Sequence, residues 1–141
     1  MADDGSDFAR SMSIATSGLR AQAGRMRVIS ENIANADSTA PTSAADPYRR
    51  KVPTFSSALD RTIDAKVVTL GKVRTDQSAF RIKHEPSNPA ADAAGNVKYP
   101  NVNPLVEMTD MREAQRSYEA NLNIISATRR MIQRTLDILK A

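Results

Sequence analysis

Apolar side chains recur with helical spacing in two segments, residues 7–36 and 103–140, and six of the seven prolines lie between them. A helix of about 30 residues is about 45 Å long at a rise of ~1.5 Å per residue. The pattern predicts a mainly α-helical chain, in which two long terminal helices form an antiparallel coiled-coil-like hairpin around a small β-rich or loop insertion. The expected division is 1–36, 37–102 and 103–141, with the two terminal segments acting together as one domain.

The first predicted helix carries a heptad pattern. Ser6 or Asp7 is its expected N-cap, because short polar side chains accept hydrogen bonds from the first backbone N–H groups. Apolar positions then follow in alternating steps of four and three, the spacing of a helix that packs along a partner helix. The seam runs through Phe8, Met12, Ala15, Leu19, Gln22, Met26, Ile29, Ile33 and Ala36.

The second predicted helix begins at Asn103 and Pro104, a cap residue followed by proline in the first turn. Its seam runs through Met108, Met111, Gln115, Tyr118, Leu122, Ile125, Arg129, Ile132, Leu136 and Leu139. A second line lies beside it at seven-residue spacing, through Ile124, Met131 and Ile138. This apolar face is wider than one partner needs. Either the helices form a free-standing hairpin or neighbouring chains in a filament cover the rest.

Antiparallel pairing sets the apolar positions of one helix against those of the other, with Leu19 near Leu122 and Ile33 near Met108 or Met111. Polar residues interrupt the seams at Gln22, Gln115 and Arg129. Two interpretations stay open for them. They are partly exposed seam positions that tolerate a polar group, or they control register, since a polar group in a seam disfavours pairings that leave it without a partner.

The middle zone reads as loops and short strands. Phe55, Leu59 and Ile63, four residues apart, predict a short helical turn, and Gly95 predicts a turn. Strands are predicted at residues 48–52, 66–73, 79–84 and 97–99. Together they indicate a hairpin or three short strands.

Composition narrows the possible classes. The chain has no Trp, and aromatic residues make up 4% of it, so helix-packing aliphatic side chains carry most of the apolar surface. Cysteine is absent, which excludes disulfides, thiolate metal sites and cysteine nucleophiles. The acidic N-terminus shows no cleaved secretory signal, and no apolar run approaches the roughly 20 residues of a membrane span.

The residues that could carry chemistry are few. The net charge of +4 is modest. The basic run Arg49–Lys51 favours a solvated strand edge over a nucleic-acid-binding patch. His84 is the only histidine, so it has no second ligand for a metal and no partner for catalysis. We expect no enzyme activity, no catalytic residue, no cofactor or metal, and no small-molecule substrate. A basic helical adaptor that binds nucleic acid or a protein partner is the alternative.

Several motifs resemble one known family, the bacterial flagellar rod and hook proteins. Ser17–Gln22 followed by Ile29–Asp37 is similar to the family's N-terminal signature, which includes Asn32 and Asn35. The segments from Asn88 to Asn103 and from Glu107 to Leu122 resemble the proximal-rod type of that family. The motifs cover nearly the whole chain in one order. The family usually has glycines where this chain reads Ser43–Asp46, so the loop at 38–47 is the visible departure.

The resemblance implies a structural role. Rod proteins of this family are exported through the flagellar type III apparatus without a cleaved signal and assemble in the periplasm into a helical tube. Their terminal helices make the axial contacts, and the tube transmits motor torque to the hook. The implied partners are copies of the chain, other rod proteins, and the ring and export-gate junction proteins of the basal body, with no nucleic acid. The implied interface residues are the seam positions, with Asn32 and Asn35 of the signature.

Overall fold

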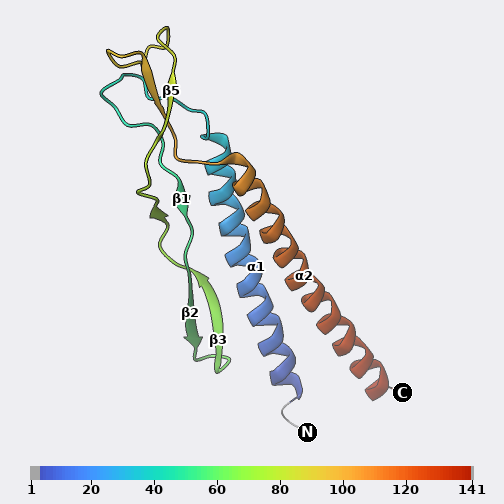
Figure 1. Ribbon diagram of the computed structural model, residues 1–141. Coiled ribbons are helices and arrows are strands. Elements are labelled where there is room, and N and C mark those ends of the chain that lie inside the picture. Colours follow the sequence, from blue (N-terminus) through green and yellow to red (C-terminus); the bar gives the residue numbers. More distant parts are fainter. Residues whose placement is uncertain (1–3, 141) are drawn as a thin grey trace. The chain divides into compact units, whose positions relative to one another are not determined.

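The structure, a computed structural model, describes residues 4–140 (Figure 1). Two long helices, α1 (Asp4–Ala34) and α2 (Pro104–Lys140), lie at the two ends of the chain, with antiparallel strands between them in the sequence. The mainly α-helical class is therefore confirmed. The predicted cap at Ser6 or Asp7 is wrong, because α1 already begins at Asp4.

The cap of α2 is confirmed. Asn103 Oδ1 accepts a hydrogen bond from the Leu105 N–H at 3.1 Å, and the Asn103 carbonyl accepts one from the Glu107 N–H at 3.1 Å. Pro104 occupies the first helical position, where its missing N–H leaves no bond unmade. The polar side chain and the proline together fix where α2 starts.

The strands are short and pair only in twos within the described residues. They are β1 (Lys51–Val52), β2 (Phe55–Asp60), β3 (Ala65–Leu70), β4 (Arg74–Thr75), β5 (Arg81–His84) and β6 (Asn96–Tyr99). All three pairs, β1–β4, β2–β3 and β5–β6, are antiparallel. All four predicted strands are found with shifted ends, as β1, β3, β5 and β6, while β2 and β4 were missed.

The segment Phe55–Asp60 is a strand, so the predicted helical turn there is wrong. It pairs residue for residue with Ala65–Leu70, from Phe55 opposite Leu70 to Asp60 opposite Ala65. Asp64 closes the hairpin with a positive φ of 48°, a conformation that Asp tolerates better than most residues. Cross-strand backbone bonds form this hairpin, and a four-residue spacing within one strand carries no information about them.

The predicted strand at 48–52 is reduced to Lys51–Val52. Before it, the Arg50 N–H donates to the side chain of Asn101 at 2.8 Å instead of to a neighbouring strand. A side chain far away in the sequence therefore takes the place of a strand partner, which local alternation of apolar and polar residues does not reveal.

Contacts divide the described chain into two compact units. Unit 1 takes residues 4–26, 54–72 and 113–140, and unit 2 takes Arg27–Pro53 and Val73–Arg112. Each helix contributes residues to both units. The units are therefore assembled from segments that are distant in the sequence.

Unit 1 contains most of both helices and the β2–β3 hairpin. The hairpin is attached to α1 at three places: Arg10 Nε donates to the Ile63 carbonyl at 2.8 Å, Ser17 Oγ accepts from the Val68 N–H at 3.2 Å, and Leu70 packs on Gly24. The residues of β2 are exposed apart from Asp60, which is half-buried. This hairpin is therefore held by its own ladder and a few attachments rather than by a core.

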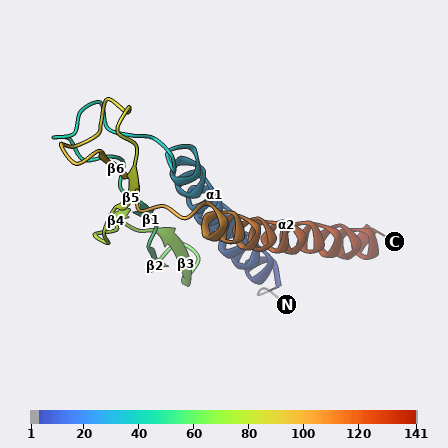
Figure 2. The same cartoon turned by 45° about the horizontal axis from the view of Figure 1, so that its top comes forward.

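Unit 2 contains the small core of the chain. Ala90, Val97 and Tyr99 are buried together, and Val97 is fully inaccessible. Figure 2 shows the loop at 37–50 beside the β5–β6 pair, where Lys98 Nζ lies 3.2 Å from Asp46 Oδ1. Arg81 donates from Nη2 to the Ala36 carbonyl at 2.6 Å, two residues beyond the end of α1.

Candidate assembly interface

The predicted seam of α1 lies mostly inward in the single chain. Ile29 and Asn32 are buried, and the remaining predicted interface residues of this helix are half-buried: Phe8, Met12, Leu19, Gln22, Met26, Ile33 and Asn35. Within residues 6–140, Gln22 Oε1 is a buried side-chain oxygen without a hydrogen-bond partner. Asn35 donates to the Glu31 carbonyl of its own helix at 2.9 Å.

The predicted seam of α2 is largely exposed. Only Ile125 is buried, and Met111, Tyr118 and Ile132 are half-buried. The exposed seam residues are Met108, Gln115, Leu122, Arg129, Leu136 and Leu139. The parallel line Ile124, Met131 and Ile138 is exposed as well.

A different line of α2 faces inward. Glu107, Ala114 and Thr128 are buried at multiples of seven residues, each one residue before a member of the predicted seam. One residue is a rotation of about 100° around a helix. Apart from Ile125, the chain therefore buries small and polar side chains of α2 and leaves many of the larger apolar ones exposed.

Two contacts in unit 1 bring α1 and α2 together. The Asn121 side chain fills the space beside Gly18, where a Cβ would come within 2.8 Å of Asn121 Oδ1. Arg25 Nη2 lies 3.6 Å from Glu113 Oε2. Leu19 and Leu122 were expected to meet, and the contact found lies one residue earlier on both helices.

In unit 2, Asn32 is the centre of a buried polar cluster. Its Nδ2 donates to the Lys51 carbonyl at 2.8 Å and to Glu107 Oε2 at 3.0 Å. Its Oδ1 accepts from the Tyr48 hydroxyl at 2.8 Å and from the Lys51 N–H at 2.9 Å. Both donors and both lone pairs of this fully buried amide are therefore used.

Glu107 is a buried carboxylate in the same cluster. Its Oε1 accepts from Arg50 Nε at 2.6 Å, and the Arg50 guanidinium also lies near Asp76 and Asp110, at 3.8 Å and 3.7 Å. A buried carboxylate keeps its charge when a cation and hydrogen bonds compensate it. Sequence reasoning missed this role of Glu107 and Arg50. The only available signal was the position of an acidic residue among the apolar residues that open α2.

The cluster also affects the phenol of Tyr48. Burial, followed by the negative charges of Glu31 and Glu107, raises the pKa of Tyr48 to about 12. Each of these influences disfavours the phenolate. Tyr48 therefore stays a hydrogen-bond donor to Asn32 throughout the neutral and mildly alkaline range.

The basic run Arg49–Lys51 is engaged within unit 2. Lys51 Nζ pairs with Glu31, Arg50 lies in the cluster with Glu107, and Arg49 lies 3.8 Å from Asp46 and 4.1 Å from the centre of the Phe80 ring. These cations are not a free patch for phosphates. His84 is exposed on β5, and its Nδ1 lies 3.4 Å from Asn96 Oδ1.

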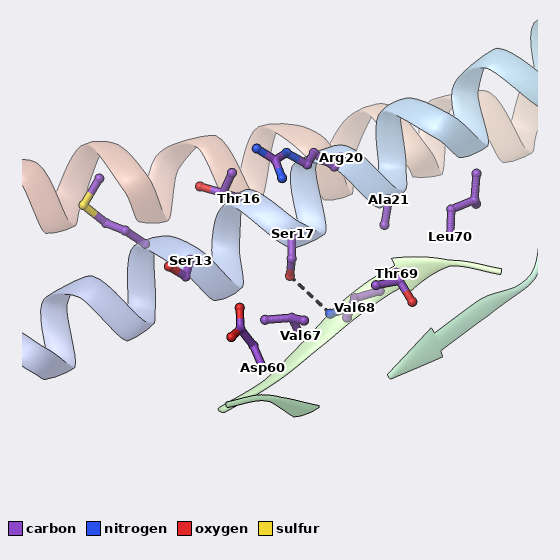
Figure 3. A pocket seen from close by; sticks show the side chains of 11 residues that line it. Ser13, Thr16, Ser17, Arg20, Ala21, Asp60, Val67, Val68, Thr69 and Leu70 are labelled. Atoms are coloured by element: carbon purple, nitrogen blue, oxygen red, sulfur yellow. Dashed lines mark hydrogen bonds between the residues drawn. The ribbon is translucent and has the colours of Figure 1, made fainter. Parts of the chain in front are cut away.

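An open groove of about 580 Å³ runs between α1 and β3 in unit 1 (Figure 3). Ser13, Ser17 and Ala21 face the strand, and Ser17 bridges the gap through its bond to the Val68 N–H. The lining combines hydroxyl groups and aliphatic side chains with two charged side chains, Arg20 and Asp60, and contains neither histidine nor an aromatic ring.

The part of the chain that the structure describes contains neither a cluster of metal ligands nor a membrane-spanning helix. Nowhere in residues 4–140 do three or more His, Asp or Glu side chains gather as metal ligands would. Neither α1 nor α2 is long and apolar enough to cross a membrane.

Known proteins resemble this chain along most of its length. Residues 12–40 match the family model described as "Flagella basal body rod protein", and residues 93–138 match "Flagellar basal body rod FlgEFG protein C-terminal". The flagellar basal-body rod protein FlgC of Agrobacterium fabrum is 54% identical over 91% of this chain and 92% of its own length. FlgC of Bacillus subtilis is 37% identical over 92% and 97%, and FlgC of Aquifex aeolicus is 35% identical over 95% and 98%.

Proposed function

The chain belongs to the family of the flagellar basal-body rod protein FlgC and is a structural subunit of the rod, not an enzyme, and we propose that its two terminal helices pack in opposite directions to build a shaft that carries motor torque to the hook. In this proposal residues 1–36 and 103–141 act as one axial domain, and residues 37–102 are an insertion. The observation that carries it is the exposed apolar face of α2.

The exposed face of α2 supports packing between subunits. Leu122 is 46% exposed, Met131 is 48% exposed and Leu139 is 77% exposed. Burying a fully exposed side chain of this kind contributes about 1.5–3 kcal/mol, so covering the half of Leu122 or Met131 that remains exposed contributes about half as much. A single subunit leaves this contribution unused, whereas a helical assembly of rod subunits would use it along the whole length of α2.

Two contacts in unit 1 support the antiparallel arrangement. Gly18 meets Asn121 and Arg25 meets Glu113, so residue numbers rise along α1 while they fall along α2. The first contact uses a glycine, which lets a side chain of the partner helix come close to the backbone. Antiparallel helices of this kind can share one seam over several turns.

The antiparallel arrangement can be tested with cysteines, since the chain has none of its own. Gly18→Cys with Asn121→Cys should form a disulfide within one subunit, because the thiol introduced at position 121 is smaller than the Asn side chain that fills this space. Gly18→Cys with Glu113→Cys is the control, since eight residues along α2 displace the thiol by about 12 Å. Oxidation of the control pair alone would contradict the proposed arrangement.

We further propose export without a cleaved signal and a periplasmic location, with other rod proteins and the ring and export-gate junction proteins as neighbours. The family supports assembly with other rod proteins. The alternative of a nucleic-acid adaptor is disfavoured by the basic run, whose side chains pair with carboxylates of the chain. Binding to DNA that weakens steeply with salt would favour that alternative.

The assembly role is tested by placing a charge on the exposed face. Leu122→Glu should abolish swimming and hook formation in a strain that lacks the native chain, because an unpaired carboxylate would enter a packed helix contact. Asn123→Glu is the matched control, since it adds the same charge one residue further at an exposed polar position. Purified basal bodies should contain the chain with Asn123→Glu and lack it with Leu122→Glu. Normal swimming with Leu122→Glu would refute the role of this face.

A further inference from the structure

The first two turns of α2 bury a carboxylate and expose aliphatic side chains, the opposite of what apolar burial alone would favour. Glu107 is 1% exposed, whereas Leu105, Val106 and Met108 are 73%, 48% and 50% exposed. Carboxylates are among the side chains least often buried, and aliphatic ones are among the most often buried. A rotation by one residue would bring Val106 or Met108 inward and return the carboxylate to water.

The network around Glu107 holds the helix in this orientation. Its two carboxylate oxygens accept from Arg50 Nε and Asn32 Nδ2, at 2.6 Å and 3.0 Å. Arg50 is further surrounded by Asp76 and Asp110, and Asn32 is bonded to the backbone at Lys51. A carboxylate at position 107 satisfies both donors, so a rotated helix would leave the half-buried Arg50 guanidinium and the buried Asn32 amide each short of one acceptor.

Stability does not explain this arrangement. Replacing a buried ion pair with apolar side chains of similar size is often neutral or stabilising, while breaking it by removing one partner is strongly destabilising. A buried polar group can instead specify one alignment among several that would bury similar apolar surface. Here the buried Glu107 carboxylate selects the rotation of α2 that leaves Leu105, Val106 and Met108 exposed.

We propose that Glu107, Arg50 and Asn32 are positioning residues that fix the rotation of Pro104–Arg112, so that Leu105, Val106 and Met108 form an outward apolar patch for a second copy of this chain. This inference rests on the proposed rod assembly. The patch carries no charged side chain, so it fits an apolar partner surface rather than a basic or acidic one. A second copy supplies such a surface, because its own α2 exposes Leu136, Ile138 and Leu139.

The first test separates folding from orientation. Arg50→Leu/Glu107→Leu removes both charges together, so the purified chain should still fold cooperatively, with a smaller loss of melting temperature than Arg50→Leu alone, yet swimming should be lost. Arg50→Lys keeps a cation beside Glu107 and should still swim. The matched control is Asp46→Leu/Arg49→Leu, which removes the ion pairs of Asp46 with Arg49 and Lys98 elsewhere in unit 2 and should also swim. A folded Arg50→Leu/Glu107→Leu chain that swims normally, or a control that does not swim, would overturn the positioning role.

The second test needs no change in the cluster and decides the matter if the leucine pair does not fold. With Met108→Cys, the thiol should react with maleimide in the purified chain, become protected in isolated basal bodies, and react again after these are denatured. In Met108→Cys/Leu139→Cys, a bifunctional maleimide should join two copies of the chain through the two introduced thiols. Protection in the free chain, reactivity in intact basal bodies, or crosslinks only to other proteins would overturn the proposed patch. Basal bodies that lack the unchanged chain altogether would instead refute the proposed function.

Discussion

The contacts that stabilise unit 2 internally differ from those that stabilise unit 1. Unit 2 has a buried polar cluster in which the amide of Asn32 uses all its hydrogen-bonding capacity, and a small apolar core around Val97. Unit 1 has an exposed strand β2, an open groove between α1 and β3, and a part of α2 in which Ile125 is buried while many other large apolar side chains are exposed. The difference indicates that unit 2 is organised within one subunit, whereas unit 1 depends on neighbours.

The largest expected effect is a contrast within each helix of the isolated chain. Amides in residues 4–26 and 113–140 should exchange hydrogen orders of magnitude faster than those in residues 27–34 and 104–112, because few buried contacts oppose local opening of unit 1. Hydrogen exchange of the purified chain, read by mass spectrometry, measures this. In assembled rods the contrast should largely disappear. Equal protection along both helices of the free chain would contradict the comparison.

Breaking the buried ion pair should destabilise unit 2 most among single substitutions. Arg50→Ala leaves the Glu107 carboxylate buried without its cation, at a cost of about 3–5 kcal/mol. Arg25→Ala is the control, because its partner Glu113 is 66% exposed and an exposed pair contributes at most about 1 kcal/mol. Urea unfolding of both variants gives the two values. A similar loss in both would mean that burial does not distinguish the two ion pairs.

A glycine in unit 2 offers a smaller effect. Gly95 has a φ of +79°, and a Cβ there would lie 2.8 Å from His84 Cε1. Gly95→Ala should therefore cost about 1–3 kcal/mol. His84→Ala alone should be nearly neutral because the ring is exposed, and His84→Ala/Gly95→Ala should recover only the steric part. Full recovery in the double variant would show that the backbone conformation carries no cost.

The smallest expected effect depends on pH. Tyr48→Phe removes the bond from the phenol to Asn32, which contributes about 1 kcal/mol at neutral pH. The pKa of Tyr48 is raised to about 12 in the folded chain, so its contribution is complete below the ordinary phenol value of 10.0 and is lost as pH rises towards 12. The difference in unfolding free energy between the two chains should therefore shrink from pH 10 upward. A difference that grows with pH would mean that the phenolate is favoured in the folded state.

The sequence by itself determined the two terminal helices, the cap at Asn103 and the family. Helix periodicity and capping depend on a few neighbouring residues, and the signature motifs are contiguous. All three can therefore be recognised from short stretches of sequence. The heptad seam also marked apolar side chains of α2 that are exposed in the structure, Leu122, Leu136 and Leu139 among them. The α1 seam, including Ile29, was recognised as apolar from the same pattern.

Only the tertiary structure decided which side chains of α2 face inward and what holds unit 2 together. Glu107 meets Asn32 across 75 positions and Arg50 across 57. Phe55–Asp60 became a strand because Ala65–Leu70 offered a matching ladder, although its spacing predicted a helical turn. Periodicity identifies the apolar side of a helix. It does not show that the Glu107 carboxylate is buried, because the cation of Arg50 and the amide of Asn32 that compensate its charge are distant in the sequence.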